Sequence, residues 1–252
     1  MAWFEDGDKR VYYEESGSGE PLLLLPGWGG SIAELAGLRE ALQRSFRVIA
    51  ADLPGSGKSG PQPRTYTPAY YAEDARTFLA MLEALHATPA RIVGFSDGGE
   101  YALLMAVLKP EAVGALVAWG SAGTLGSNFE MAEVMASVVD NPIPPMQEFS
   151  AYMKATYGEA NARIMTQTAA KAFRAVMEAG GNISRSRAGE IRCPALLITG
   201  EHDFLAPPAL VADTARAIPD ADFVQADGAS HQVHLERGEW LAETITGWLA
   251  KH

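Results

Sequence analysis

The stretch Gly94-Phe95-Ser96-Asp97-Gly98-Gly99 decides the fold of this chain. An apolar run over residues 91–95 leads into it, and a helical pattern over residues 101–109, which ends at Pro110, follows it. A serine flanked by glycines at a junction of strand and helix is typical of a sharp, strained turn, because larger side chains two positions away would collide across it. Such a turn exposes the serine hydroxyl, and the helix N-terminus favours negative charge that develops there. The stretch therefore predicts a nucleophilic serine, Ser96, at the edge of a sheet.

Further apolar runs indicate that this sheet is large and mostly parallel. They show no alternation of polar and apolar residues, as strands buried on both faces require. Runs of this kind cover residues 22–25, 47–51, 91–95, 115–119 and 195–199. A hairpin precedes them over residues 2–5 and 10–15, and one more strand is expected over residues 222–225.

Helical patterns lie between these runs. The clearest covers residues 71–85, and Thr67 and Pro68 are its predicted N-cap and first-turn residue. A helix near residues 208–217 and an amphipathic helix over residues 235–249 continue the alternation. Strands that alternate with helices predict an α/β protein with a doubly wound sheet.

The segment over residues 123–188 departs from this alternation. It shows helical periodicity only, until the helix stop signal Gly180-Gly181. We interpret residues 123–188 as an inserted helical cap, and residues 1–122 and 189–252 as the core. A chain of 252 residues can form one domain of this kind.

Composition excludes several classes of partner. The net charge of -11 opposes binding to nucleic acid and to anionic membranes. The apolar stretches fall far short of the roughly 20 residues that a membrane-spanning helix needs. The start of the sequence lacks the basic and apolar regions of a secretory signal, and the single cysteine, Cys193, excludes an intrachain disulfide. We therefore expect a cytoplasmic protein, a monomer or a small homo-oligomer, without nucleic-acid or membrane partners.

A serine hydroxyl attacks poorly unless a base removes its proton, so the chain must supply a histidine and a residue that orients it. Two loops downstream fit these roles. Asp203 stands in the loop after residues 195–199, and His231 stands in the loop after the last strand. The chain order Ser96, Asp203, His231 is the one that nucleophile-elbow folds use.

Other residues compete for these roles. His234 is the rival to His231, but it opens the final helical pattern instead of standing in the loop. Glu201 could replace Asp203, yet Asp203 stands two positions further from the strand end, where the loop can reach the histidine. His86 and His252 fit structural or solvated positions, and His202 faces the wrong loop for a base.

The negative oxygen that forms during attack needs two preorganised backbone donors. One is expected to be the N–H of Asp97, the residue after the nucleophile. The other is expected from Pro26-Gly27-Trp28-Gly29-Gly30, where Gly27 lets the backbone turn and leaves the Trp28 N–H directed at the site. The alternative is a plain turn before a helix.

Three further patterns do not support cofactor binding. The stretch Gly55-Ser56-Gly57-Lys58-Ser59-Gly60 matches G-x-G-x-x-G, but Pro61-Gln62-Pro63 follows where a phosphate-binding helix would have to begin. A Walker A motif would need a glycine where Asp52 stands. His231 and His234 lack the glutamate of an H-E-x-x-H zinc motif. We therefore expect no nucleotide, no other cofactor and no catalytic metal.

Over nearly its whole length the chain resembles the biphenyl-hydrolase-like, or valacyclovirase, group of the α/β-hydrolases. The more specific matches are Phe95-Ser96-Asp97-Gly98-Gly99, Ala118-Trp119-Gly120, Gly181-Asn182-Ile183 and Arg192-Cys193-Pro194-Ala195-Leu196. The resemblance implies the α/β-hydrolase fold, a mostly parallel, doubly wound eight-stranded sheet with an inserted helical cap.

The resemblance also implies a substrate class. Proteins of this group hydrolyse α-amino-acid esters, and the aspartate after the nucleophile binds the substrate ammonium; Asp97 matches that position. A free α-ammonium does need a nearby carboxylate, although Asp97 could instead stabilise the first turn of its helix. Trp28 is bulkier than the residue expected in this group and would narrow the acyl side of the pocket. The cap beyond Ser121 matches only loosely, which leaves the leaving group open.

The sequence thus predicts a cofactor-independent serine hydrolase of small esters, with α-amino-acid esters as the expected substrates. Asp97 and Trp28 are the expected substrate-binding residues. The alternative enzymes are a general carboxylesterase, a lactonase or a C–C bond hydrolase with the same three residues. An alternative of another class is a ligand-binding protein of hydrolase fold with negligible turnover.

Overall fold

The structure is a computed structural model that describes residues 2–127 and 129–252. Its strands form one eight-stranded sheet in the order β1-β2-β4-β3-β5-β6-β7-β8. They are β1 (Ala2–Asp6), β2 (Lys9–Ser16), β3 (Glu20–Leu25), β4 (Phe46–Ala51), β5 (Ala90–Phe95), β6 (Val113–Trp119), β7 (Ala195–Gly200) and β8 (Ala221–Ala226). β1 and β2 form an antiparallel hairpin, and β2 pairs antiparallel with β4. Every other pairing is parallel, which confirms the predicted sheet.

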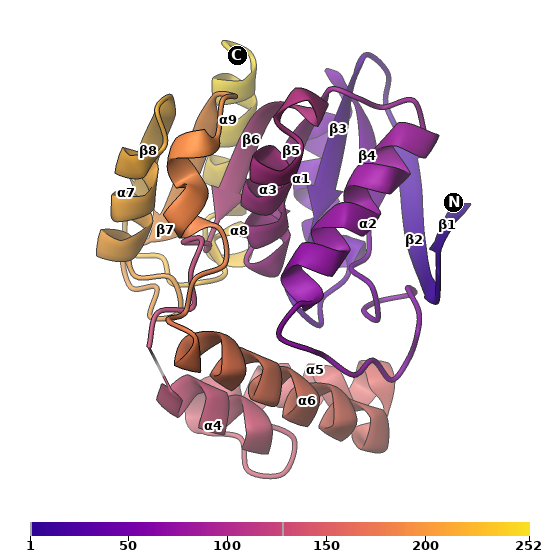
Figure 1. Cartoon of the computed structure of the whole chain (residues 1–252), viewed down its shortest axis with the longest axis vertical. Helices are drawn as coiled ribbons and strands as arrows, with labels where there is room; N and C mark the ends of the chain where they lie inside the picture. The colour runs from indigo at the N-terminus through magenta and orange to yellow at the C-terminus, as the bar shows by residue number, and fades with distance from the viewer. Residues whose placement is uncertain (1, 128) are drawn as a thin grey trace.

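Helices cover both faces of the sheet (Figure 1). They are α1 (Ala36–Leu42), α2 (Tyr70–Ala84), α3 (Asp97–Leu108), α4 (Phe129–Ser137), α5 (Gln147–Tyr157), α6 (Glu159–Glu178), α7 (Pro208–Ala217), α8 (Val233–Glu236) and α9 (Gly238–Leu249). Short 3-10 helices are η1 (Ile32–Leu35), η2 (Pro110–Ala112), η3 (Pro144–Met146) and η4 (Arg185–Glu190). No helix among the described residues combines the length and the apolar character needed to cross a bilayer.

The apolar strands are buried on both faces because each face packs against its own helices. Leu23 and Leu25 of β3 belong to the core under α2, α3 and α7. Leu22 and Leu24 belong to the core under α1 and α9. The absence of alternation in the sequence is thus explained by two hydrophobic layers, one on each side of the sheet.

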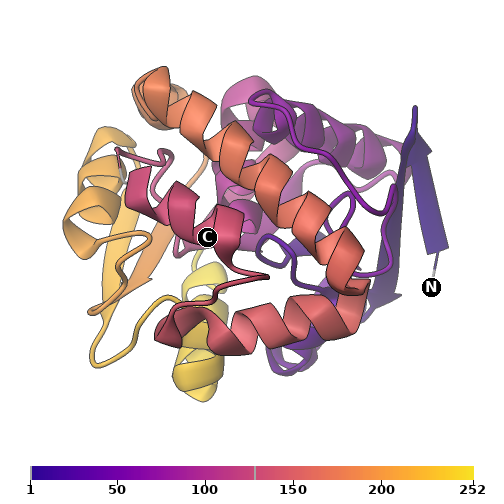
Figure 2. The same ribbon diagram turned by 90° about the horizontal axis from the view of Figure 1, so that it is seen from below.

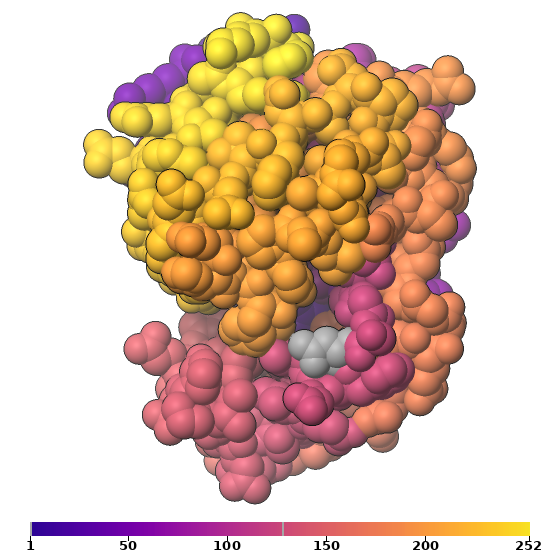
Figure 3. Space-filling view, turned by 90° about the vertical axis from the view of Figure 1, so that its left-hand side faces the viewer, coloured from indigo at the N-terminus to yellow at the C-terminus, as the bar shows by residue number. Residues whose placement is uncertain are grey.

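A third layer of helices lies beyond the ends of the strands. α4, α5 and α6 follow β6 in the chain and lie below the sheet in Figure 1; Figure 2 shows them from below. The two connections of this layer to the sheet are held together, because the Gly123 carbonyl accepts from the N–H groups of Ile183, Ser184 and Arg185. In Figure 3 the surface is hollowed between these pink helices and the gold segments above. We call α4–α6 the cap helices; the boundaries at residues 123 and 188 stay a prediction.

Three helix boundaries differ from the sequence prediction. α2 begins at Tyr70, because Thr67 and Pro68 form a separate turn in which the Thr67 carbonyl accepts from the Tyr70 N–H. α3 begins directly after Ser96 and ends at Leu108, so it includes the glycines that were assigned to the turn. The final helix is broken into α8 and α9 at Arg237, whose φ of -136° and ψ of 40° are not helical.

Candidate active site

Ser96 lies in a strained turn between β5 and α3. Its φ of 51° and ψ of -118° are unusual for a residue with a side chain, and such strain is typical of functional sites. The turn needs its glycines: a Cβ on Gly98 would lie 2.6 Å from the Leu25 carbonyl oxygen, and one on Gly94 would overlap the backbone of Gly98. The Ser96 N–H donates to the Trp119 carbonyl at 2.8 Å. The side chain of Ser96 is held at the end of the sheet and remains partly exposed.

The structure brings Ser96, His231 and Asp203 together from three separate loops. His231 Nε2 lies 3.1 Å from Ser96 Oγ, and His231 Nδ1 lies 2.9 Å from Asp203 Oδ2. With its proton on Nδ1, the imidazole donates to Asp203 and directs the Nε2 lone pair at the serine hydroxyl. This is the geometry that a general base needs to accept the serine proton.

The Asp203 carboxylate is fixed by its own loop. Its Oδ1 accepts from the N–H groups of Leu205 and Ala206, both at 2.9 Å. The side chain is fully buried, so water does not compete for the bond to His231. Two backbone donors and one imidazole donor therefore compensate the burial of the carboxylate.

Gly120 leaves room for the His231 ring. A Cβ at Gly120 would lie 2.9 Å from His231 Cε1, and its φ of +65° also favours glycine. On another side the Phe95 ring packs against the imidazole with 5.0 Å between the ring centres. These contacts restrict the ring to the orientation that joins Asp203 and Ser96.

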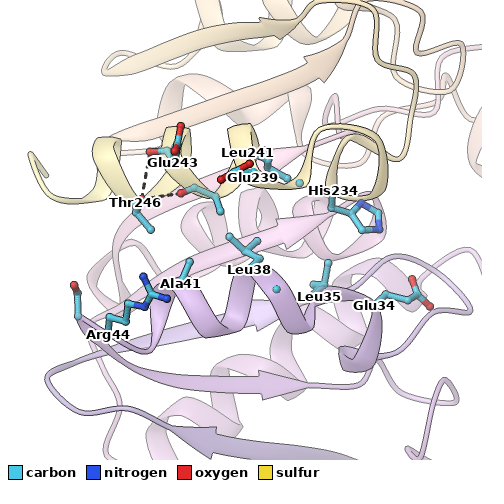
Figure 4. A pocket seen from close by; sticks show the side chains of 14 residues that line it. Glu34, Leu35, Leu38, Ala41, Arg44, His234, Glu239, Leu241, Glu243 and Thr246 are labelled. Atoms are coloured by element: carbon cyan, nitrogen blue, oxygen red, sulfur yellow. Dashed lines mark hydrogen bonds between the residues drawn. The ribbon is translucent and has the colours of Figure 1, made fainter.

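His234 and Glu201, the rival residues, have other partners. The imidazole of His234 packs on Phe95, and burial lowers its pKa to about 4, so it is neutral at physiological pH. His234 lies at one end of a groove of about 540 Å³ between α1 and α9, on the sheet face opposite α2 and α3 (Figure 4). Glu201 accepts from the Gly228 N–H at 2.8 Å and lies 3.9 Å from His202 Nε2.

Trp28 lies in a tight turn next to the serine. The Gly30 N–H donates to the Gly27 carbonyl at 3.1 Å, and Gly29 has a φ of +73°, as in a type II turn. A Cβ on Gly27 would lie 3.4 Å from Ser96 Cβ, so the two turns touch. A turn of this type leaves the N–H of its second residue, Trp28, unused.

Asp97 is the first residue of α3, where backbone N–H groups have no intrahelical acceptor. Within the described part of the chain, neither the Trp28 N–H nor the Asp97 N–H makes a hydrogen bond. Both N–H groups predicted to form the oxyanion hole are therefore available, one on each side of Ser96.

The Asp97 carboxylate contacts α2. Its two oxygens accept from the hydroxyl groups of Tyr70 and Tyr71, at 2.8 and 3.0 Å. Only 6% of the residue is exposed, and burial raises its pKa to about 6 although the two hydroxyl donors oppose the shift. No ion pair to Asp97 occurs in residues 2–127 and 129–252. The carboxylate is thus buried beside the candidate nucleophile, and no ion pair in the described part of the chain compensates its charge.

The loop over residues 55–60, which matches G-x-G-x-x-G in sequence, packs around the Asp52 carboxylate. Its carboxylate accepts from the N–H groups of Ile32 and Lys58, both at 2.7 Å. A Cβ on Gly57 would overlap this carboxylate, so a negative group already occupies the concave side of the loop. Among the described residues no group of three or more histidine, cysteine, aspartate or glutamate side chains could hold a metal ion.

Sequence reasoning missed three residues of this site. Tyr71 was recognised only as part of a helical pattern, and neither Tyr70 nor Tyr157 of α5 was singled out. Tyr157 contacts the turn of Trp28 through its hydroxyl group. The adjacent tyrosines were the one available signal, because two hydroxyl groups on a buried helix face require acceptors.

Comparisons with known proteins agree with this architecture. The family described as the alpha/beta hydrolase fold matches residues 20–142. The chain is 31% identical to the protein named carbamate hydrolase RutD of Azorhizobium caulinodans, over 98% of each chain. It is 28% identical to the serine hydrolase BPHL of Homo sapiens, over 79% of this chain and 68% of that protein. The solved enol-lactonase from Burkholderia xenovorans superposes with a TM-score of 0.80 at 22% identity, over 99% of this chain and 100% of that one.

Proposed function

This chain belongs to the alpha/beta-hydrolase family, and on that basis we propose that it is a serine hydrolase that cleaves small carboxylic esters through an acyl-enzyme. One observation carries the proposal: Asp203, His231 and Ser96 form a continuous chain of contacts at 2.9 and 3.1 Å that ends at a partly exposed serine. The relatives are named as hydrolases of several substrates, which supports hydrolysis and leaves the substrate to be decided by the site.

The geometry fits a two-step reaction. As Ser96 Oγ attacks the ester carbonyl carbon, His231 Nε2 takes its proton, and the carbonyl oxygen becomes negative between the N–H groups of Trp28 and Asp97. Collapse of this intermediate expels the alcohol, which receives the proton from His231. Water then attacks the acyl-enzyme with His231 again as base, which releases the acid and restores Ser96.

The alternative hydrolases share the attack of Ser96 on a carbonyl carbon and differ in the leaving group. A lactone, a carbamate or a C–C bonded ketone would place a different leaving group at the same carbonyl. A ligand-binding protein would retain the three residues and release product no more than once per chain. Repeated turnover of an ester separates the enzyme from this last alternative.

Replacement of the serine tests the proposal. We expect Ser96→Ala to lower kcat on short-chain acyl esters by roughly 10³-fold or more, because the remaining groups cannot form the acyl-enzyme. The variant should keep the thermal unfolding temperature of the parent protein within a few degrees, since Ser96 Oγ makes no contact that supports the fold. An activity within tenfold of the parent protein would mean that another group performs the attack.

A preference for α-amino-acid esters is the finer proposal, and the environment of Asp97 favours it. A buried carboxylate without a cation is costly, and its raised pKa reports that cost. The α-ammonium of a bound amino-acid ester would supply the missing charge next to Ser96. Tyr70 and Tyr71 would then hold the carboxylate in place for this contact.

The test compares a valine ester with the matching isovalerate ester. Asp97→Asn removes the charge and keeps the backbone N–H, so kcat/KM should fall tenfold or more on the valine ester and about twofold or less on the isovalerate ester. Tyr71→Phe is the matched control, because it removes one hydroxyl donor and keeps the charge. Equal losses on both esters in Asp97→Asn would assign Asp97 a structural role and favour a general carboxylesterase.

A further inference from the structure

The cap helices contact the turn of Trp28 through apolar side chains of α5, such as Phe149, and through one hydroxyl group. Tyr157 ends α5, and its hydroxyl donates to the Gly29 carbonyl at 2.7 Å and accepts from the Gly57 N–H at 2.9 Å. The residue is 6% exposed, and burial raises its pKa to about 12, so the hydroxyl keeps the proton that it donates. A cap residue thereby joins two core loops that are far apart in sequence.

The hydrogen bond from Tyr157 to the Gly29 carbonyl holds the same peptide unit whose N–H closes the turn. The peptide unit between Gly29 and Gly30 has one carbonyl and one N–H. The N–H donates to Gly27, and the carbonyl accepts from Tyr157. Both polar groups of this unit are therefore held, one by the turn itself and one by the cap.

The core holds the other end of the same loop. Asp52 accepts from the Ile32 N–H and from the Lys58 N–H, both at 2.7 Å, which ties the loop after β3 to the loop after β4. Tyr157 joins the same two loops at Gly29 and Gly57. The turn that carries the Trp28 N–H is fixed from the core by Asp52 and from the cap by Tyr157.

We propose that Tyr157 is a positioning residue that holds the Trp28 N–H in the orientation needed for the oxyanion hole. This inference rests on the proposed serine-hydrolase function. A donor that is free to rotate stabilises a developing oxyanion poorly, because the free-energy cost of ordering the donor then adds to the activation barrier. The Tyr157 hydroxyl therefore couples the position of the cap helices to the orientation of the Trp28 N–H, in addition to the packing of Phe149 on Trp28.

Removal of this hydroxyl should affect the transition state more than substrate binding. We expect Tyr157→Phe to lower kcat about tenfold on a short-chain ester and to leave KM within about twofold. A trifluoromethyl ketone, which forms a negative oxygen when Ser96 adds to it, should bind more weakly by the same factor as kcat falls. Tyr13→Phe is the matched control, because Tyr13 is equally buried in β2 and is 7% exposed.

Hydrogen exchange tests, independently of activity, whether Tyr157 holds the turn of Trp28 in place. In Tyr157→Phe, peptides that contain residues 26–32 and 55–60 should exchange faster, whereas in Tyr13→Phe they should exchange as in the parent protein. Unchanged exchange in Tyr157→Phe would show that Tyr157 does not hold the turn, and would overturn the proposal whatever the activity. Faster exchange with unchanged kcat, or a loss in KM alone, would overturn the positioning role. A parent protein that fails to hydrolyse any ester would refute the proposed function instead, and the exchange result would still decide whether Tyr157 holds the turn.

Discussion

At the residue scale, two histidines lie on the same aromatic ring and differ in what they face. Phe95 packs against both His231 and His234, but only His231 has Ser96 on one nitrogen and Asp203 on the other. His234 Nδ1 lies 3.5 Å from Trp119 Nε1, and its Nε2 is buried without a hydrogen-bond partner among the residues that the structure describes. The difference in partners gives the two imidazoles different roles.

Alanine at each histidine tests this assignment. We expect His231→Ala to lose roughly 10³-fold or more in kcat, because no other imidazole reaches the serine proton. His234→Ala should lose less than about tenfold in kcat, with a lower thermal unfolding temperature from the cavity it leaves. Steady-state kinetics of both variants on one ester decides; a larger loss in kcat for His234→Ala would contradict the assignment.

The orienting acid is tested in the same way. Asp203→Asn would present an amide to His231 Nδ1 and favour the wrong tautomer, so kcat should fall by several orders of magnitude, on the order of 10⁴-fold. Glu201→Gln changes the contacts with the Gly228 N–H and with His202 and should stay within a few-fold of the parent protein. Similar losses in the two variants would leave the role of Asp203 without support.

The sequence allowed only those site residues to be grouped that follow the ends of predicted strands. Ser96, Asp203 and His231 each follow the end of a strand, and the ends of parallel strands meet at one edge of a sheet. The partners of the Asp97 carboxylate, Tyr70 and Tyr71, could not be assigned in this way. Their hydroxyl groups reach Asp97 only because α2 packs on α3, and that packing depends on tertiary contacts.

At the element scale, α3 carries a second buried carboxylate that affects stability. Glu100 accepts from the N–H groups of Ala122 and Gly123 with one oxygen, and its other oxygen has no partner among the described residues. Burial raises its pKa from 4.5 to about 8. Glu100 thus secures the segment where the chain leaves β6 for the cap helices.

This raised pKa predicts a loss of stability as the pH rises. Between about pH 4.5 and pH 8 the folded protein holds a proton on Glu100 that the unfolded chain has lost, so the free energy of unfolding falls as the pH rises. Glu100→Gln cannot titrate and lacks this contribution. Urea unfolding at pH 5.5 and 8.5 should show a loss in the parent protein that exceeds the loss in Glu100→Gln, by on the order of 2 kcal/mol. Equal losses would contradict the burial of an ionisable Glu100.

The elements themselves differ in how well the sequence predicts them. The buried strands were predicted within a residue or two, because apolar runs without polar interruptions fit few other structures. The start of α2 was predicted wrongly, and the break at Arg237 was not predicted. Each feature coincides with a local hydrogen bond. The Tyr70 N–H donates to the Thr67 carbonyl at the start of α2, and the Ser230 N–H donates to the Glu236 carboxylate just before the break.

At the scale of the whole molecule, the site is assembled where the core and the cap helices meet. The sheet supplies Ser96, Asp203 and His231 from the ends of its strands, and α5 supplies Tyr157 to the turn of Trp28. The sequence indicated a helical insertion but not which of its residues reach the core, because helical periodicity does not specify what a buried face packs against.

The central claim is that Ser96 is the nucleophile of this molecule, and a covalent probe tests it most directly. After exposure to a fluorophosphonate, mass spectrometry of the intact protein and of its peptides should show a single adduct on Ser96, absent in Ser96→Ala and formed much more slowly in His231→Ala. An adduct on another residue, or a folded protein whose Ser96 does not react, would contradict the account.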